Sequence, residues 1–352
     1  MKITKELTLN VIYGGLLLGG GGGGTLSGGF NVLEMLSSVG DPEIIEIDDL
    51  EDGDIIITAS LVGSPASKTS YVDLNHYKKV YELIQNNTKS EIKGIITNEM
   101  GAQSSTNGFI LSALTNIPLI NSPCNGRAHP TGIMGSLGLH KKFGYLSIQA
   151  GAGGKGVQNI EVYVKSGVEN ASKTIRNASI EAGGFVTVLR NPVEVSYVKE
   201  HAAVGAFTKS LGLGKVINDN KGHIGRMLKK LEPYGLSVIG EGVVVSKTLR
   251  IKNGFDLGNL IVGEGSRRYE IVFWNEYMTL EDENGVRLAT FPDLIAIIDK
   301  RSALPVTSAE IKEGQDVYIV KMCKEGLDLS STMRDKNIIS SVSNTISKTI
   351  DI

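Results

Sequence analysis

Runs of β-branched residues alternate with apolar residues at helical spacing along the first half of the chain. The segment "IKGIIT" predicts a strand, "NGFILSALTN" a helix and "IPLINSP" a second strand, with the polar loop "NEMGAQSST" after the first strand. These lengths suit a βαβ crossover, which joins parallel strands. Ligands of open parallel sheets bind outside the carboxyl ends of the strands, so we expect the loops that begin at "NEMG" and "NSPCNGRAHP" to face a common crevice.

The rest of the pattern changes character twice. Before the crossover, "FNVLEMLSSVG" predicts a helix that ends at Gly40, "EIIEIDDL" and "GDIIITASLVGSP" predict strands, and "NHYKKVYELIQNN" predicts a helix. From about Ser172 to Leu231 the pattern is largely helical, and from Gly242 it consists of short β-rich runs with turn signals between them, including the hairpin signal "NG" at 284–285. After about Ser330 the chain is serine-rich and polar, which indicates partial order at best.

These elements predict an α/β protein. We expect an amino-terminal α/β domain with parallel strands and helices, which forms the ligand crevice, over residues 1–165. A mainly helical segment over 166–240 would pack on it, followed by a smaller β-rich carboxy-terminal domain over 241–330 and a polar tail over 331–352.

Six consecutive glycines, Gly19 to Gly24, stand between two of these elements. Each would weaken a helix or strand by roughly 0.5–1 kcal/mol relative to alanine, so some feature must use the bare backbone. One reading is a dinucleotide site, because the run satisfies G-x-G-x-x-G and Asp48 follows 24 residues after Gly24 at the end of a predicted strand. The others are a loop packed closely against other backbone, and a loop whose N–H groups contact a carbonyl or carboxylate ligand. For the last reading the candidate substrate-binding residues are Gly21, Gly22 and Gly23.

Glu99 directly follows an apolar strand. A carboxyl at a buried strand end can have a raised pKa and act as an acid or base, or it can bind a metal. The alternative is a glutamate that caps the following loop or pairs with a lysine. Asn107, at the start of the next predicted helix, is a further candidate for substrate binding.

The loop "NSPCNGRAHP" places Cys124, Asn125, Arg127 and His129 within six residues. Cysteine and histidine are ligands for zinc, and Arg127 could hold a carboxylate in a bidentate grip. Three readings stay open: a divalent metal such as zinc held with Glu99, a nucleophilic Cys124 activated by His129, and a packed loop without chemistry.

Composition narrows the class of protein. With 352 residues, of which 41% are hydrophobic, the chain is long enough for two domains. The 36 lysines and arginines against 38 acidic residues give a net charge of −2 without a basic cluster, so we expect no nucleic-acid partner. Two cysteines, Cys124 and Cys323, are too few for a disulfide framework, and "VIYGGLLLGGGGGG" is too short and glycine-interrupted to span a bilayer. We expect a cytoplasmic protein without membrane attachment.

Three separated motifs carry a resemblance to a known family. "GGLLLGGGGGG", "NEMGAQSSTNGFILSALTNIPLINSPCNGRAHP" and "FWNEYMTLEDENGVRLATFPDLIAIID…LPVTSAEIKEGQDVYIV" resemble, in that order, the S-methyl-thiohydantoin desulfurase family, and the likeness covers most of residues 8–322. The resemblance implies an α/β domain followed by a β-rich domain, and hydrolysis of a thiohydantoin-type ring, with metal assistance as one option. It also implies a glycine run that lines the crevice opposite Glu99. Members often accompany hydantoinase and oxoprolinase enzymes, which implies a hydantoinase-like partner.

The chain also departs from the family pattern. Asn121 and Pro123 stand where acidic residues are usual, and His129 and Thr131 replace a phenylalanine and an acid. Either a carboxylate-based centre is missing, or Cys124 and His129 replace it. The residues that carry over are Gly126, Arg127, Ala128 and Pro130, with Glu99 before them and Asn275 and Asp293 after them.

We therefore expect a hydrolase of a small cyclic amide or thioamide related to hydantoin, acting as a homo-oligomer. Glu99, Cys124 and His129 are the candidate catalytic and metal-binding residues. The candidate substrate-binding residues outside the glycine run are Asn107, Arg127, Asn275 and Asp293. One alternative is a non-catalytic ligand-binding or accessory subunit of a hydantoinase-like enzyme, and another is the dinucleotide-binding enzyme.

Overall fold

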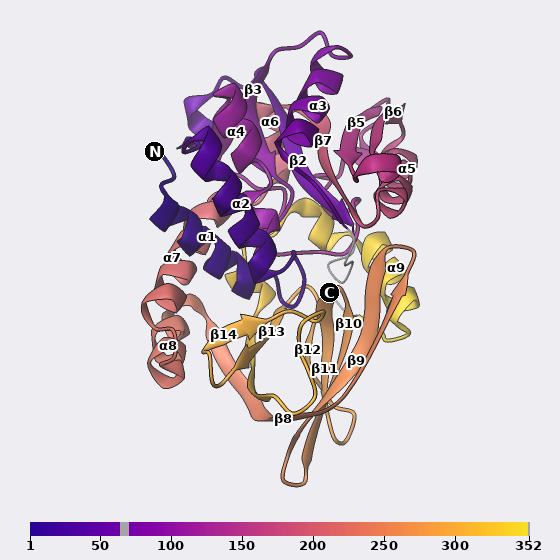
Figure 1. Cartoon of the computed structure of the whole chain (residues 1–352). Helices are drawn as coiled ribbons and strands as arrows, with labels where there is room; N and C mark the ends of the chain where they lie inside the picture. Colours follow the sequence, from indigo (N-terminus) through magenta and orange to yellow (C-terminus); the bar gives the residue numbers. More distant parts are fainter. Residues whose placement is uncertain (64–69, 351–352) are drawn as a thin grey trace.

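The computed structural model describes residues 1–63 and 70–350, which form an α/β domain above a β-rich domain (Figure 1). This confirms the predicted fold class. Ser64 and Pro65, at the end of one predicted strand, and the last two residues of the predicted tail lie outside the described residues.

The amino-terminal sheet is half parallel and half antiparallel. Its strands follow the order β1 (Ile44–Ile45), β4 (Leu119–Ile120), β3 (Ile92–Thr97), β2 (Ile55–Gly63), β7 (Phe185–Glu194), β5 (Ser147–Gly153) and β6 (Ile160–Ser166). The first four run parallel, so the predicted crossover between β3 and β4 is confirmed. Strand β7 pairs antiparallel with β2 and β5 and joins the two halves.

Helices cover both faces of this sheet. Helix α3 (Leu74–Gln85) has an amphipathic pattern, begins at the capping residue Asp73 and buries Tyr77 and Val80 in the core that contains Ala150 and Ala152 of β5. Helix α4 (Phe109–Thr115) packs beside it, and helix α2 (Leu26–Val39) packs against α4. On the opposite face, α5 (Val168–Glu181) packs Ile175 against Val186 and Val188.

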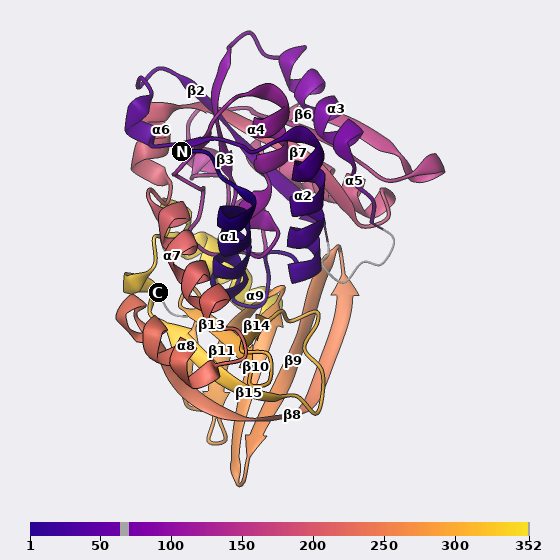
Figure 2. The same cartoon turned by 60° about the vertical axis from the view of Figure 1, so that its left-hand side comes forward.

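Helix α1 (Lys5–Leu18) is buried on almost all sides because it lies against α7 (Ala206–Asp219), as Figure 2 shows. The helices approach so closely that a Cβ on Gly14 would stand 1.9 Å from the carbonyl oxygen of Ser210, and a Cβ on Gly214 would stand 1.6 Å from that of Asn10. The glycines that interrupt the apolar run of α1 are thus explained by helix packing.

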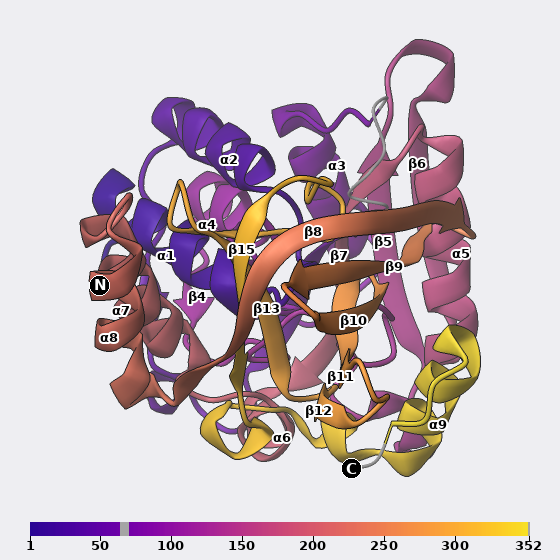
Figure 3. The same cartoon turned by 90° about the horizontal axis from the view of Figure 1, so that it is seen from below.

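The carboxy-terminal domain is a single antiparallel sheet of eight strands. Their order is β12 (Arg287–Thr290), β11 (Glu276–Asp282), β10 (Arg267–Trp274), β9 (Phe255–Glu264), β8 (Leu236–Lys252), β15 (Asp316–Met322), β13 (Leu294–Asp299) and β14 (Leu304–Val306). The predicted "NG" hairpin joins β11 to β12, and Gly285 has a φ of +75°. Strand β8 is the longest, and its far end reaches α5 of the first domain (Figure 3).

Three segments differ from the sequence predictions. The region predicted to be largely helical contains α5, α6 (Val195–His201), α7 and α8 (Ile224–Leu231), but also the long strand β7. The predicted strand "EIIEIDDL" forms only the two residues of β1, followed by the 3-10 turn η1 (Ile47–Asp49). The serine-rich end forms α9 (Lys336–Ile346), whose apolar face (Ile338, Ile339 and Val342) is buried against the second domain. Its serines lie among these apolar residues at helical spacing, which explains why composition alone indicated disorder.

Among residues 1–63 and 70–350, no helix is long and apolar enough to cross a membrane.

Candidate functional site

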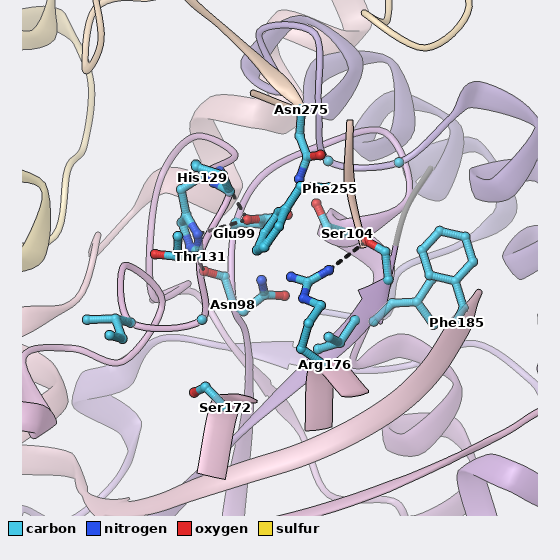
Figure 4. Close-up of a pocket in the computed structure, with 18 of the residues that line it drawn as sticks. Asn98, Glu99, Ser104, His129, Thr131, Ser172, Arg176, Phe185, Phe255 and Asn275 are labelled. Carbon is cyan, nitrogen blue, oxygen red and sulfur yellow. Dashed lines mark hydrogen bonds and ion pairs between the residues drawn. The ribbon is translucent and has the colours of Figure 1, made fainter. Parts of the chain in front are cut away.

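A cavity of about 530 Å³ lies where the two domains meet. Its walls come from the end of β2, the loop after β3, residues 129–133, helix α5 with strand β7, and residues 253–255 and 274–276 of the second domain. Figure 4 shows polar side chains from these different elements, among them Glu99, His129 and Arg176, around one space. The loops "NEMG" and "NSPCNGRAHP" both contribute to it, as the strand topology predicted.

Glu99 and His129 form the polar end of the cavity. The backbone N–H of His129 donates to Oε2 of Glu99 over 3.1 Å, and the ring Nδ1 of His129 lies 3.3 Å from the same oxygen. Burial raises the pKa of the Glu99 carboxyl to about 7, although the His129 N–H and the charge of Arg190 act in the opposite direction. Burial and the same Arg190 charge lower the pKa of His129 to about 3, so its ring is neutral. At neutral pH the Glu99 carboxyl is therefore partly protonated, whereas the His129 ring carries no charge.

Arg190 is a buried cation whose charge acts on Glu99, although the two side chains form no close ion pair. It lies on β7, is 2% exposed and lines the cavity. Its Nε has no hydrogen-bond partner, and no ion pair of the described residues involves its guanidinium. The glycines of the neighbouring loop make room for it, since a Cβ on Gly132 or Gly135 would come within 3.0 and 3.2 Å of its terminal nitrogens. A buried charge without a close ion-pair partner is costly, which points to a ligand with a partial or full negative charge.

A second cation closes the cavity on the side of β8. Nη1 of Arg176 donates to the carbonyls of Gly63 (2.9 Å) and Gly254 (3.2 Å), and its guanidinium carbon lies 4.3 Å from the centre of the Phe255 ring. Burial lowers the pKa of Arg176 to about 10, which leaves it charged at neutral pH. The contact ties the β8–β9 turn of one domain to α5 of the other, and Phe255 packs edge-on against Trp274 to form an aromatic wall.

The glycine run is divided between packing and the cavity. Gly23, which was predicted to bind substrate, lines the cavity, and so does Gly24. Gly21 and Gly22 do not line it, because they pack against Tyr277 and Glu276 of the second domain. The run is a close domain contact at one end and a cavity wall at the other.

The other predicted substrate-binding residues are also divided. Asn275 lines the cavity. Asn107 lies behind it, where its side-chain amide donates to Oδ1 of Asn98 over 2.8 Å and orients that lining residue. Asp293 accepts the backbone N–H of Lys324 over 2.8 Å outside the cavity.

Arg127, the predicted carboxylate anchor, lies in the contact between the domains. It is fully buried, donates to the carbonyls of Ala128, Pro292 and Asp293, and stacks on Phe291 with its guanidinium carbon 4.7 Å from the ring centre. It is not among the residues that line the cavity. These contacts favour a structural role for this side chain.

Cys124 is not brought together with Glu99 and His129. It is fully buried in an apolar cluster, its sulfur lies 3.3 Å from the hydroxyl of Thr58, and it does not line the cavity. Burial raises the pKa of the thiol to about 11, which disfavours the reactive thiolate. Within the described part of the chain no three His, Cys, Asp or Glu side chains form a group that could hold a metal ion. Glu99 and His129 alone supply fewer donors than the three protein ligands of a typical catalytic zinc site, so these residues do not fit the predicted centre.

The geometry contradicts the dinucleotide reading. The glycine run joins helix α1 to helix α2, whereas the dinucleotide motif requires a strand before the glycines. The side chain of Asp48 is 85% exposed and pairs with Lys199 over 3.2 Å. The glycines therefore do not follow a strand, and the acidic residue does not lie where it could bind a ribose.

Sequence reasoning missed two of the residues that define the cavity, Arg190 and Glu276. Arg190 was missed because β7 lies in a region that was predicted to be largely helical, although the β-branched run "FVTVLR" after Gly183 and Gly184 is a strand signal. Glu276 carries no motif that singles it out in the sequence, and only the fold brings it to the glycine run.

Comparison with known proteins agrees with this architecture. Two family models match: the S-Me-THD-like N-terminal domain over residues 8–158 and the S-Me-THD-like C-terminal domain over residues 166–329. No curated protein matches the chain. The fold is similar to a crystal structure of a protein from Chromobacterium violaceum, with a TM-score of 0.73 and 14% identity over 99% of this chain and 96% of that one. At this identity the likeness shows the fold alone.

Proposed function

Because the chain belongs to the S-Me-THD-like family, we propose that it hydrolyses a small cyclic amide or thioamide of the hydantoin or thiohydantoin type. The observation that carries the proposal is Glu99: a buried carboxyl with a pKa of about 7 that faces a cavity beside neutral His129. The family name is consistent with a thiohydantoin-related role, and the reaction is inferred from the side chains.

Glu99 acts as the general base. A pKa close to the working pH makes a carboxyl an effective base that is still ionised in a sizeable fraction of molecules. In the ionised state it accepts a proton from a water molecule, which then attacks an sp² carbon of the ring. The N–H of His129 holds Oε2 in place for this step.

Arg190 stabilises the negative charge that develops on the ring during the attack. Its guanidinium makes no ion pair with the described residues, so its charge is available to a carbonyl oxygen or a ring nitrogen of the substrate. Burial of the Arg190 side chain strengthens this interaction, because charges interact more strongly in a protein interior than in bulk water.

The remaining lining suits a flat heterocycle. Phe255 and Trp274 offer an aromatic surface, and the amides of Asn98 and Asn275 lie at the same cavity. Hydantoin-type rings alternate N–H and C=O groups around one plane, a pattern that side-chain amides recognise by paired hydrogen bonds. No step of this proposal uses a metal.

The test is turnover by the purified protein of a panel of rings: hydantoin, 2-thiohydantoin and its S-methylated derivative. Ring opening or thiol release would be measured for the wild type and for Glu99→Gln, Arg190→Gln and Glu283→Gln. We expect losses of about 10²-fold or more in kcat for Glu99→Gln and of similar size in kcat/KM for Arg190→Gln. Glu283 is exposed in the β11–β12 turn, so its variant should retain the wild-type rate.

Two results would contradict the proposal: no turnover of any ring by the wild type, or unchanged rates in Glu99→Gln. The first result together with copurification of a hydantoinase-like protein would support the accessory-subunit alternative.

A further inference from the structure

We propose that Glu276 is a second catalytic residue, which in its protonated form gives a proton to the leaving group of the ring, and that the glycine run makes room for its carboxyl. This inference rests on the proposed hydrolase function.

The position of Glu276 suits a proton donor. It is the first residue of β11, it is 1% exposed, and it lines the cavity across the domain contact from the loop that carries Glu99. Its Oε2 has no hydrogen-bond partner, and no ion pair within residues 1–63 and 70–350 involves it. Asn275, with a φ of +55°, turns the chain sharply just before it. A buried carboxyl oxygen without a hydrogen-bond partner at a cavity wall can carry a proton for a ligand.

The glycine run shapes the space for this carboxyl. A Cβ on Gly22 would stand 1.9 Å from Oε1 and 2.5 Å from Cδ of Glu276, so any other residue would displace the acid. The run is also fastened to the second domain, because the carbonyl of Gly20 accepts the N–H of Tyr277 over 2.6 Å and that of Gly21 accepts the N–H of Ser308 over 2.8 Å. The bare backbone at this point therefore lets a carboxyl of the other domain enter a buried position.

Burial and the nearby carboxylates favour the protonated form of Glu276. Burial raises the pKa of Glu276 well above its ordinary value, the charges of Glu99 and Asp256 raise it further, and the charge of Arg127 acts in the opposite direction. When Glu99 is ionised, Glu276 is therefore the acid that stays protonated. Two carboxyls with different proton affinities in one cavity can divide the roles of base and acid.

With Glu99 as the base and Glu276 as the acid, a ring that carries an S-alkyl group can be hydrolysed in the following steps. Water attacks the ring carbon, a C–O bond forms, the C=N electron pair moves to nitrogen, and Glu99 takes a proton from the water. The nitrogen pair then re-forms C=N and the C–S bond breaks. The thiolate leaves with the bonding pair and takes the proton of Glu276. The ring product tautomerises to the amide, and proton exchange with solvent returns Glu99 and Glu276 to their starting forms.

The test varies the leaving group. Two substrates share one ring and differ in the thiol released, a methylthio group against a 4-nitrophenylthio group, whose thiolate is stable without a proton. The wild type, Glu276→Gln, Glu99→Gln and the exposed control Glu283→Gln would be assayed for thiol release with both. The ratio of the two rates within one preparation does not depend on how much of a variant is folded.

We expect Glu276→Gln to lose about 10²-fold or more with the methylthio substrate and less than about threefold with the nitrophenylthio substrate. Glu99→Gln should lose activity with both, because both need the attacking water. Equal losses of Glu276→Gln with the two substrates would overturn the role of Glu276 and leave the proposed function intact. Failure of the wild type with both substrates would overturn the proposed function and this inference together.

Discussion

Replacement of Glu99 by glutamine should change how the stability of the protein depends on pH. The Glu99 side chain is buried, and burial raises its pKa from 4.5 to about 7. The native state therefore holds this proton more tightly than the unfolded state does, so stability falls as the pH rises from about 4.5 to about 7 and levels off above that range. At about 1.4 kcal/mol per pKa unit, the full loss is about 3 kcal/mol, of which about 2–3 kcal/mol falls between pH 5 and pH 8.

Glutamine removes the titration and still offers an oxygen to the N–H of His129. We therefore expect the free energy of unfolding of Glu99→Gln, relative to the wild type, to rise by about 2–3 kcal/mol from pH 5 to pH 8. Urea unfolding would be followed by the fluorescence of Trp274, the single tryptophan, which is buried at the same cavity. Contributions of the titrating groups that do not interact with Glu99 cancel in the difference, and Glu283→Gln controls for the loss of one carboxylate. A change below about 1 kcal/mol would refute the reasoning, because Glu99 would then ionise near its ordinary pKa.

Four further predictions concern residues that the sequence singled out. Gly22→Ala should lower the free energy of unfolding in urea by about 1–3 kcal/mol or more, because the added Cβ overlaps a buried carboxyl. The control Gly53→Ala should be near neutral, because no atom lies within 4 Å of the added Cβ. Equal effects of the two substitutions would argue against the close packing of Gly22. Arg127→Met should lower the free energy of unfolding by about 3–5 kcal/mol in calorimetry, since it leaves the carbonyls of two residues in the second domain unpaired. A variant of unchanged stability with a raised KM would instead favour the predicted role of Arg127 in binding a substrate carboxylate. A thiol reagent should modify exposed Cys323 quickly and buried Cys124 only on unfolding, as mass spectrometry of the native protein would show; rapid double labelling would revive the nucleophile hypothesis. Metal analysis of protein purified without a histidine tag should give well below one zinc per chain, since the three predicted ligands do not meet; one zinc, lost in Cys124→Ala/His129→Ala, would restore the metal prediction.

Local patterns in the sequence determined much of the fold. The βαβ unit from β3 to β4, the amphipathic helix α3 and the hairpin at Gly285 all follow from apolar periodicity and turn residues within short windows. The loops that carry Glu99 and His129 could be placed at one sheet edge, because parallel strands direct their carboxyl ends to the same side. The resemblance to a family extended this to the order of the two domains.

Only the tertiary structure decided which polar residues share the cavity. Cys124 and His129 are five positions apart, yet one points into an apolar cluster and the other toward the cavity, because the loop between them turns through the buried contact of Arg127. Arg190 comes from a strand in the middle of a sheet, and Glu276 comes from the other domain. The burial and the pKa of a side chain depend on all its neighbours in space, and the neighbours of these two side chains lie far away along the chain. The glycine run shows what each source of information contributes. Its composition indicates that some contact needs a backbone without side chains, and the tertiary structure shows that this contact makes room for the carboxyl of Glu276 from the second domain.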